Sequence, residues 1–130
     1  MRRMNERGEA ALELAIVAPV LMLLLLGVVQ FGLWYHGQNV VQTAALEASR
    51  VASAEEAGSN EGEDRARNVL RAGLGSAASE PIVLVDLGQD DVRVSIQASM
   101  RGLLPLPGLS NIRLSAESVS YRERFRSAEQ

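Results

Sequence analysis

Residues 7–26 read RGEAALELAIVAPVLMLLLL, and this stretch decides the fold. An apolar run of roughly 22 residues extends from Leu14 to Tyr35, interrupted only by Pro19, Gln30 and small residues. As a helix it would reach roughly 33 Å, which is enough to cross a bilayer core of about 30 Å. A span tolerates one proline when neighbouring groups satisfy the freed backbone carbonyl. The run therefore predicts a membrane-spanning helix.

Two other interpretations of the run are less favoured. A buried core helix needs cover on every side, and the rest of a 130-residue chain is too small to provide it. A secretory signal peptide would have an apolar stretch of about 7–15 residues followed by a cleavage site. This run is longer, and the following segment, QFGLWYHGQNV, has no convincing small-x-small site. A retained anchor is the favoured interpretation.

Charge and aromatic residues predict the orientation of this anchor. Arginines precede the run at positions 2, 3 and 7, and none follows it directly. This asymmetry places the N-terminus in the cytoplasm and the C-terminal part outside. Trp34 and Tyr35 then lie at the outer interface, where amphipathic rings are favoured. The predicted membrane-interface residues are Arg2, Arg3, Arg7, Trp34 and Tyr35.

Composition argues against several functional classes. The net charge of −3 does not indicate a nucleic-acid partner, and the absence of cysteine excludes disulfides and thiolate sites. His36 is the only histidine, and no nucleophile elbow or phosphate-binding loop occurs. The acidic cluster in NEGEDR lacks the spacing of a calcium loop and is typical of a solvated helix start. We therefore expect neither enzymatic activity nor a metal or cofactor.

Gly8 and Glu13 suggest proteolytic processing at the start of the run. Glycine provides an uncluttered backbone that a peptidase can hold in extended form. Cleavage after Gly8 would remove a basic leader, residues 1–8, and make Glu9 the new N-terminus. Glu13 would then lie one helical turn from the new α-amino group, on its own chain or a neighbouring one, and would pair with it. The alternative is that Gly8 is a linker and Glu13 an interfacial charge on an uncleaved anchor.

This arrangement resembles the prepilin processing signature of a basic leader, a glycine, a glutamate at the fifth mature position and an apolar helix. The segment from Arg7 to about Ala52 resembles more closely the TadE-like family, minor pilins or pseudopilins of the tight-adherence (Flp, type IVb/IVc) pilus. The resemblance is carried by RGEAALELAIVAPVL, by the glycine and aromatic residues that follow, and by AALEASRVA. It implies a prepilin peptidase, other pilins and the pilus assembly machinery as partners, and the bacterial cytoplasmic membrane as the location. Major Flp pilins have an aromatic residue after the glutamate, where Leu14 stands here, and this favours a pseudopilin.

Small residues mark two candidate helix-packing surfaces. Ala11, Ala15 and Ala18 share one face of the predicted span. Beyond Trp34 the pattern becomes one-sided, with small apolar residues at spacings of three and four. We expect this amphipathic stalk to continue the helix to about residue 57 and to pack mainly on its own domain. Its stripe consists of Val41, Ala44, Ala45, Ala48, Val51 and Ala52.

The remaining residues, 58–130, predict a small extracytoplasmic head. One amphipathic helix is expected over residues 61–78, followed by strands over 81–87, 91–100 and 112–125 with a bulge between Ala116 and Val119. The leucines of the last connection need cover, which we expect the head itself to provide, with the membrane or another subunit as the alternatives: Leu103, Leu104, Leu106 and Leu109. The predicted fold class is α+β, pilin-like in outline, with a three-stranded antiparallel sheet.

Two functions follow from these expectations. In the first, the protein is a minor pilin that leaves the membrane for a pilus, whose role in adhesion, DNA uptake or secretion the sequence leaves open. In the second, the leader stays, and the protein is a permanently anchored single-pass accessory protein of the pilus or secretion machinery.

Overall fold

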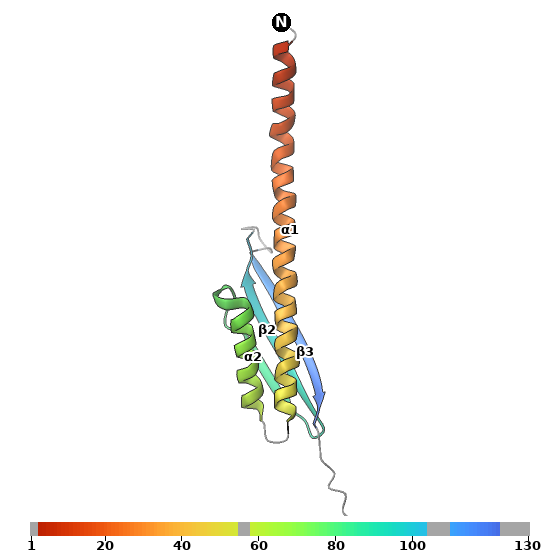
Figure 1. Ribbon diagram of the computed structural model, residues 1–130, viewed down its shortest axis with the longest axis vertical. Helices are drawn as coiled ribbons and strands as arrows, with labels where there is room; N and C mark the ends of the chain where they lie inside the picture. The colour runs from red at the N-terminus through yellow and green to blue at the C-terminus, as the bar shows by residue number, and fades with distance from the viewer. Residues whose placement is uncertain (1–2, 55–57, 104–109, 123–130) are drawn as a thin grey trace, which may run out of the picture.

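The computed structural model describes residues 3–54, 58–103 and 110–122, with side chains from Gly8 onward. It contains a long N-terminal helix, a second helix and a three-stranded antiparallel sheet, which confirms the predicted α+β class. The long helix, α1 (Arg3–Ser53), extends far beyond the other elements (Figure 1). The described residues from 58 onward, here called the head domain, pack along the C-terminal half of α1 only (Figure 1).

α1 runs without a break through both Gly8 and Pro19. A glycine inside a helix costs only about 1 kcal/mol relative to alanine, and the turns on either side offset that cost because helix growth is cooperative. In this structure the helix starts at Arg3, five residues before Gly8. Arg2 lies outside the described residues, as do the side chains of Arg3 and Arg7.

The second helix, α2 (Ser59–Leu74), is displaced toward the N-terminus relative to the predicted range of 61–78. It begins at Gly58, whose backbone N–H donates to Oε2 of Glu61 at 2.9 Å. It ends at Leu74, and its C-cap Gly75, which has a φ of 56°, is the first residue of a 3-10 turn, η1 (Gly75–Ala77). A positive φ is easily adopted only by glycine, and this position stops the helix before the predicted end.

The sheet is an antiparallel meander in the order β1 (Ile82–Leu87), β2 (Asp91–Arg101) and β3 (Asn111–Tyr121). β2 and β3 pair in one unbroken register, from Asp91 opposite Tyr121 to Arg101 opposite Asn111. The predicted bulge is therefore wrong. The inward-facing side continues through the buried Ser118, while Val119 faces outward. Of the leucines expected to be covered by the head, Leu103 is exposed, and Leu104, Leu106 and Leu109 lie outside the described residues.

One apolar core joins α1, α2 and the inner face of the sheet. Ile96, Val92 and Val94 of β2 form its centre, and the small residues of α1 lie against them. Three strands alone bury little area, so the stalk stabilises the sheet by covering it. The α1 positions buried in this core are Val41, Ala44, Ala45, Ala48 and Ala52.

Two glycines of α2 set its close approach to α1. A Cβ at Gly62 would lie 2.8 Å from the Cβ of Ala52, and one at Gly73 would lie 2.5 Å from Cγ1 of Val40. Both distances are shorter than real carbon contacts, so any larger residue would push the helices apart. An ion pair between Arg65 and Glu47 also links the two helices.

Candidate membrane anchor and assembly site

The N-terminal half of α1 is an apolar rod with nothing packed on it among the described residues. Its large apolar side chains from Leu12 to Val29 are 39–70% exposed. In the part of the chain that the structure describes, α1 is the one helix long and apolar enough to cross a membrane, and none of its most apolar segment is buried. From Leu14, the first apolar residue after Glu13, to Val29 the bare part is roughly 24 Å long at about 1.5 Å per residue. About four more residues of α1, beside the head domain, complete the roughly 30 Å of a bilayer core, and this length indicates membrane anchoring.

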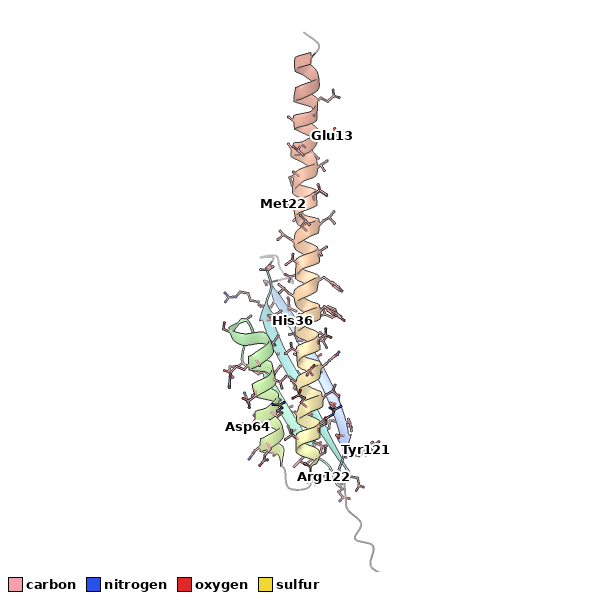
Figure 2. All side chains as sticks on the ribbon, viewed as in Figure 1. Glu13, Met22, His36, Asp64, Tyr121 and Arg122 are labelled. Atoms are coloured by element: carbon pink, nitrogen blue, oxygen red, sulfur yellow. The ribbon has the colours of Figure 1, made fainter. Side chains whose placement is uncertain are left out.

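Glu9 and Glu13 lie four residues apart on the same face of this bare helix. Both are exposed, and Figure 2 shows Glu13 and Met22 on the part of α1 that extends beyond the head domain. Two carboxylates at this spacing repel each other by a few tenths of a kcal/mol in an exposed helix. A cation placed between them would relieve that repulsion. The predicted partner, a new α-amino group at Glu9, has the required charge and position.

The small-residue face of the bare helix is open. Ala11, Ala15 and Ala18 are exposed, and within the described residues no other element covers them. The second predicted surface has a different environment. Ala44, Ala45 and Ala48 are buried at 0–1% exposure against α2 and the sheet of the same chain. In this structure the second set is therefore used within the chain, and only the first set is available to a neighbouring helix.

Three aromatic side chains cluster on α1 near the level at which the head domain begins. The ring centroid of Phe31 lies 5.7 Å from that of Trp34 and 6.5 Å from that of Tyr35. All three are exposed. Phe31 adds to the predicted interface pair, and its spacing of three and four residues from the other two was the signal for it.

The head domain first contacts α1 at Gln30. Oε1 of this side chain accepts a hydrogen bond from the backbone N–H of Leu103 at 2.9 Å, and the residue is only 9% exposed. The last residues of the predicted span, 14–35, therefore lie beside the head domain. An amide left without partners in hydrocarbon costs several kcal/mol, so the cover of Gln30 removes a penalty from the outer end of the anchor.

Further contacts hold the head domain to α1 just beyond Gln30. Nε2 of Gln38 donates to the backbone oxygen of Ser115 on β3 at 2.7 Å. Nε2 of His36 lies 3.2 Å from the backbone oxygen of Gly73, which makes this histidine a link between the two helices. Gly37 is buried, and a Cβ there would lie 2.8 Å from Cδ1 of Leu114. Together these contacts attach the head domain directly at the end of the anchor, with no flexible linker between them.

Sequence reasoning missed several of these positions. In the sequence Gln30 is only an interruption of the apolar run, and nothing local shows that a loop far along the chain pairs with it. The sequence also did not predict that Gly62 and Gly37 are packing positions. A glycine within an amphipathic pattern does signal close packing, but the partner is visible only in three dimensions.

The acidic residues at the start of α2 act within the helix. Glu61 accepts hydrogen bonds from its own backbone N–H and from that of Gly58, and these lower its pKa below the ordinary value of 4.5. Oε1 of Glu63 pairs with Arg67 one turn later, at 2.8 Å from NH2. The cluster thus satisfies the free backbone groups and the charge of a helix start.

Comparison with known families gives one result. Residues 8–50 match the family described as TadE-like protein, which confirms the resemblance seen in the sequence. The match is consistent with a TadE-like protein of the Tad pilus system, and it associates the chain with that machinery and with a membrane. The matched segment lies entirely within α1. No curated protein and no solved structure matches the chain.

Proposed function

We propose that this protein is a minor pilin, or pseudopilin, of a Tad-type pilus. Its bare apolar helix inserts in the cytoplasmic membrane with the N-terminus inside, and its head domain lies outside. In assembly, the helix exchanges lipid for the equivalent helices of other subunits. The role is structural and not catalytic. The observation that carries the proposal is the apolar half of α1, exposed along its whole length and matched to a pilus-associated family.

Processing after Gly8 is part of this proposal. A prepilin peptidase removes residues 1–8 and leaves Glu9 at the N-terminus. Because Gly8 lies inside α1, the peptidase must first unwind about two turns at the helix end. Glycine weakens the helix at this point, and a helix end frays more easily than its interior, so local unwinding has a low cost.

The second candidate is a permanently anchored accessory protein that keeps its N-terminal residues. The continuous helix through Gly8 favours it, since a helical peptide bond is a poor protease substrate. Both candidates share the membrane anchor and the outer head domain. They differ in the N-terminus of the mature chain and in whether the protein ever leaves the membrane.

The N-terminus of the protein extracted from its native membrane distinguishes the two candidates. Mass spectrometry should find Glu9 at the start of the chain for a processed pilin. Gly8→Arg should abolish this product, because a long side chain blocks the cleavage site. Asn5→Arg is the matched control, since it adds the same charge to the leader three residues from the site. A wild-type chain that keeps residues 1–8 in cells with an active prepilin peptidase would contradict the pilin proposal and support the accessory role.

A further inference from the structure

The described ends of β2 and β3 that flank residues 104–109 lie at the end of the head domain nearest the N-terminus, and these described residues are here called the hairpin end. Figure 1 shows this hairpin end closer to the bare part of α1 than any other part of the head domain. The hydrogen bond between Leu103 and Gln30 fixes its level along the helix. The described residues at this end are Arg101, Gly102 and Leu103, with Arg113 on the neighbouring strand.

The position of Gln30 along α1 places this level at the edge of the bilayer. A hydrocarbon core that begins at Leu14, the first apolar residue after Glu13, takes roughly 20 residues and ends near residue 33. Gln30 then lies about three residues, or roughly 4–5 Å, inside that edge. A group bonded directly to Gln30 must share its depth. Leu103 therefore reaches the boundary between acyl chains and headgroups.

The side chain at this depth is apolar and open. Leu103 is 54% exposed. The exposed rings of Phe31, Trp34 and Tyr35 occupy the adjacent part of α1. Aromatic and large apolar side chains are favoured at this boundary of a membrane and disfavoured in water. The hairpin end and the aromatic cluster thus both present exposed apolar or aromatic side chains at a similar depth.

The hairpin end of the sheet carries positively charged side chains, which suit a surface of lipid phosphates. Arg101 and Arg113 are exposed on the outer face at the hairpin end, on diagonal positions of β2 and β3. Within the described residues neither forms an ion pair, while the nearby Glu80 pairs at 3.9 Å with Arg67. The opposite end of the sheet carries three acidic residues and two arginines: Asp86, Asp90, Asp91, Arg93 and Arg122. Arginine binds lipid phosphates, whereas carboxylates are repelled by an anionic surface.

We propose that this hairpin end is a second membrane contact of the protein. Leu103 inserts at the outer boundary of the same bilayer that α1 spans, and Arg101 and Arg113 bind lipid phosphates. The contact fixes the tilt and rotation of the head domain on the membrane before assembly. This proposal rests on the membrane anchoring proposed above, and the partner that the hairpin end binds is the lipid surface.

Single-tryptophan variants in lipid bilayers test this contact. Trp34 is the only tryptophan in the sequence, so Trp34→Phe gives a silent background for the full-length chain. Leu103→Trp is then the test variant. Leu84→Trp, exposed on the outer face of β1, is the negative control, and Leu21→Trp in the bare helix is the positive control. The bilayers contain phosphatidylglycerol and phosphatidylcholine, the latter brominated near the headgroup or near the chain end.

Each of the three variants has a distinct expected result. With shallow bromines, Leu103→Trp should lose about twofold more emission than Leu84→Trp, and with deep bromines its loss should be smaller. Leu21→Trp should be quenched most by deep bromines. If Leu21→Trp is quenched and Leu103→Trp behaves as Leu84→Trp does, the hairpin contact is overturned while anchoring stands. If Leu21→Trp itself is not quenched, the anchoring is wrong.

The arginines are tested in the same Leu103→Trp background. Arg101→Gln with Arg113→Gln should reduce the quenching in bilayers with phosphatidylglycerol, and Arg122→Gln at the far end of the sheet should not. Equal quenching in both variants would exclude the role of the arginines.

Discussion

Oγ of Ser49 on α1 lies 2.9 Å from Oγ of Ser118 on β3, and both side chains are buried in the core of the head domain. Ser49 also donates to the backbone oxygen of Leu46, which leaves its own oxygen free to accept from Ser118. This pair connects the stalk to the last strand at the place where sequence analysis predicted a bulge. A polar residue thus occupies an inward position without breaking the strand, because a hydrogen-bonding partner lies opposite.

Ser118→Ala should destabilise the head domain by about 1 kcal/mol, since it removes one buried hydrogen bond. The double variant with Ser49→Ala should cost less than the sum of the two single variants, because neither change then leaves a buried hydroxyl unpaired. Urea unfolding of the full chain in detergent micelles, followed by circular dichroism, measures these differences. Strict additivity would show that the two hydroxyls do not interact.

Gly62→Val should destabilise the protein by about 1–3 kcal/mol, because the new side chain overlaps α1 at Ala52 and at the backbone oxygen of Ala48, 3.1 Å from the Cβ position. Gly27→Val is the matched control, with nothing within 4 Å of its Cβ position. The same urea titration compares the two. An unchanged midpoint for Gly62→Val would mean that α2 does not pack this closely on α1.

Glu61 should give the head domain a pH-dependent contribution to stability. Hydrogen bonds from its own N–H and from that of Gly58 lower its folded pKa below 4.5. The stabilisation is thus fully present above pH 4.5 and is lost as the pH falls through the folded pKa. Thermal unfolding of the wild type and Glu61→Gln should differ at neutral pH and converge in acid. A difference that persists or grows in acid would contradict the assignment.

Glu13→Ala should leave the protein in the membrane and still processed, but should lower its incorporation into pili. The reason is the lost ion pair with a new α-amino group in an apolar setting, where an unpaired charge is costly. Quantitative immunoblotting of sheared pili against the membrane fraction measures the ratio. Glu80→Ala, at a side chain 97% exposed on the head domain, is the control. Normal incorporation of Glu13→Ala would exclude the pairing.

The fold was largely predictable from local patterns. The apolar run, the alternating residues of β2 and the stripe of alanines each determine one element, because helix and strand periodicities differ. The helix boundaries were harder to predict from the sequence. The end of α2 depends on one glycine with a positive φ, and the start of α1 depends on cooperative helix growth through Gly8.

Long-range pairs could not be predicted from the sequence. The bond between Gln30 and Leu103 joins residues 73 positions apart, and the pair Ser49 and Ser118 joins residues 69 apart. In the sequence Gln30, Ser49 and Ser118 appear only as polar residues at positions where the pattern favours an apolar side chain. Only the three-dimensional structure shows that these polar residues form the hydrogen bonds between α1 and the head domain.

The central claim is that α1 holds the head domain on the outer side of the membrane, and the lack of cysteine allows a direct test. Gln97→Cys on the exposed face of β2 and Ala10→Cys near the N-terminal end of α1 each introduce a single thiol. A maleimide that does not cross the membrane, applied to spheroplasts, should label the Gln97→Cys variant at once and the Ala10→Cys variant only after lysis. Labelling of Gln97→Cys only after lysis, or recovery of the protein free of membrane, would contradict the account.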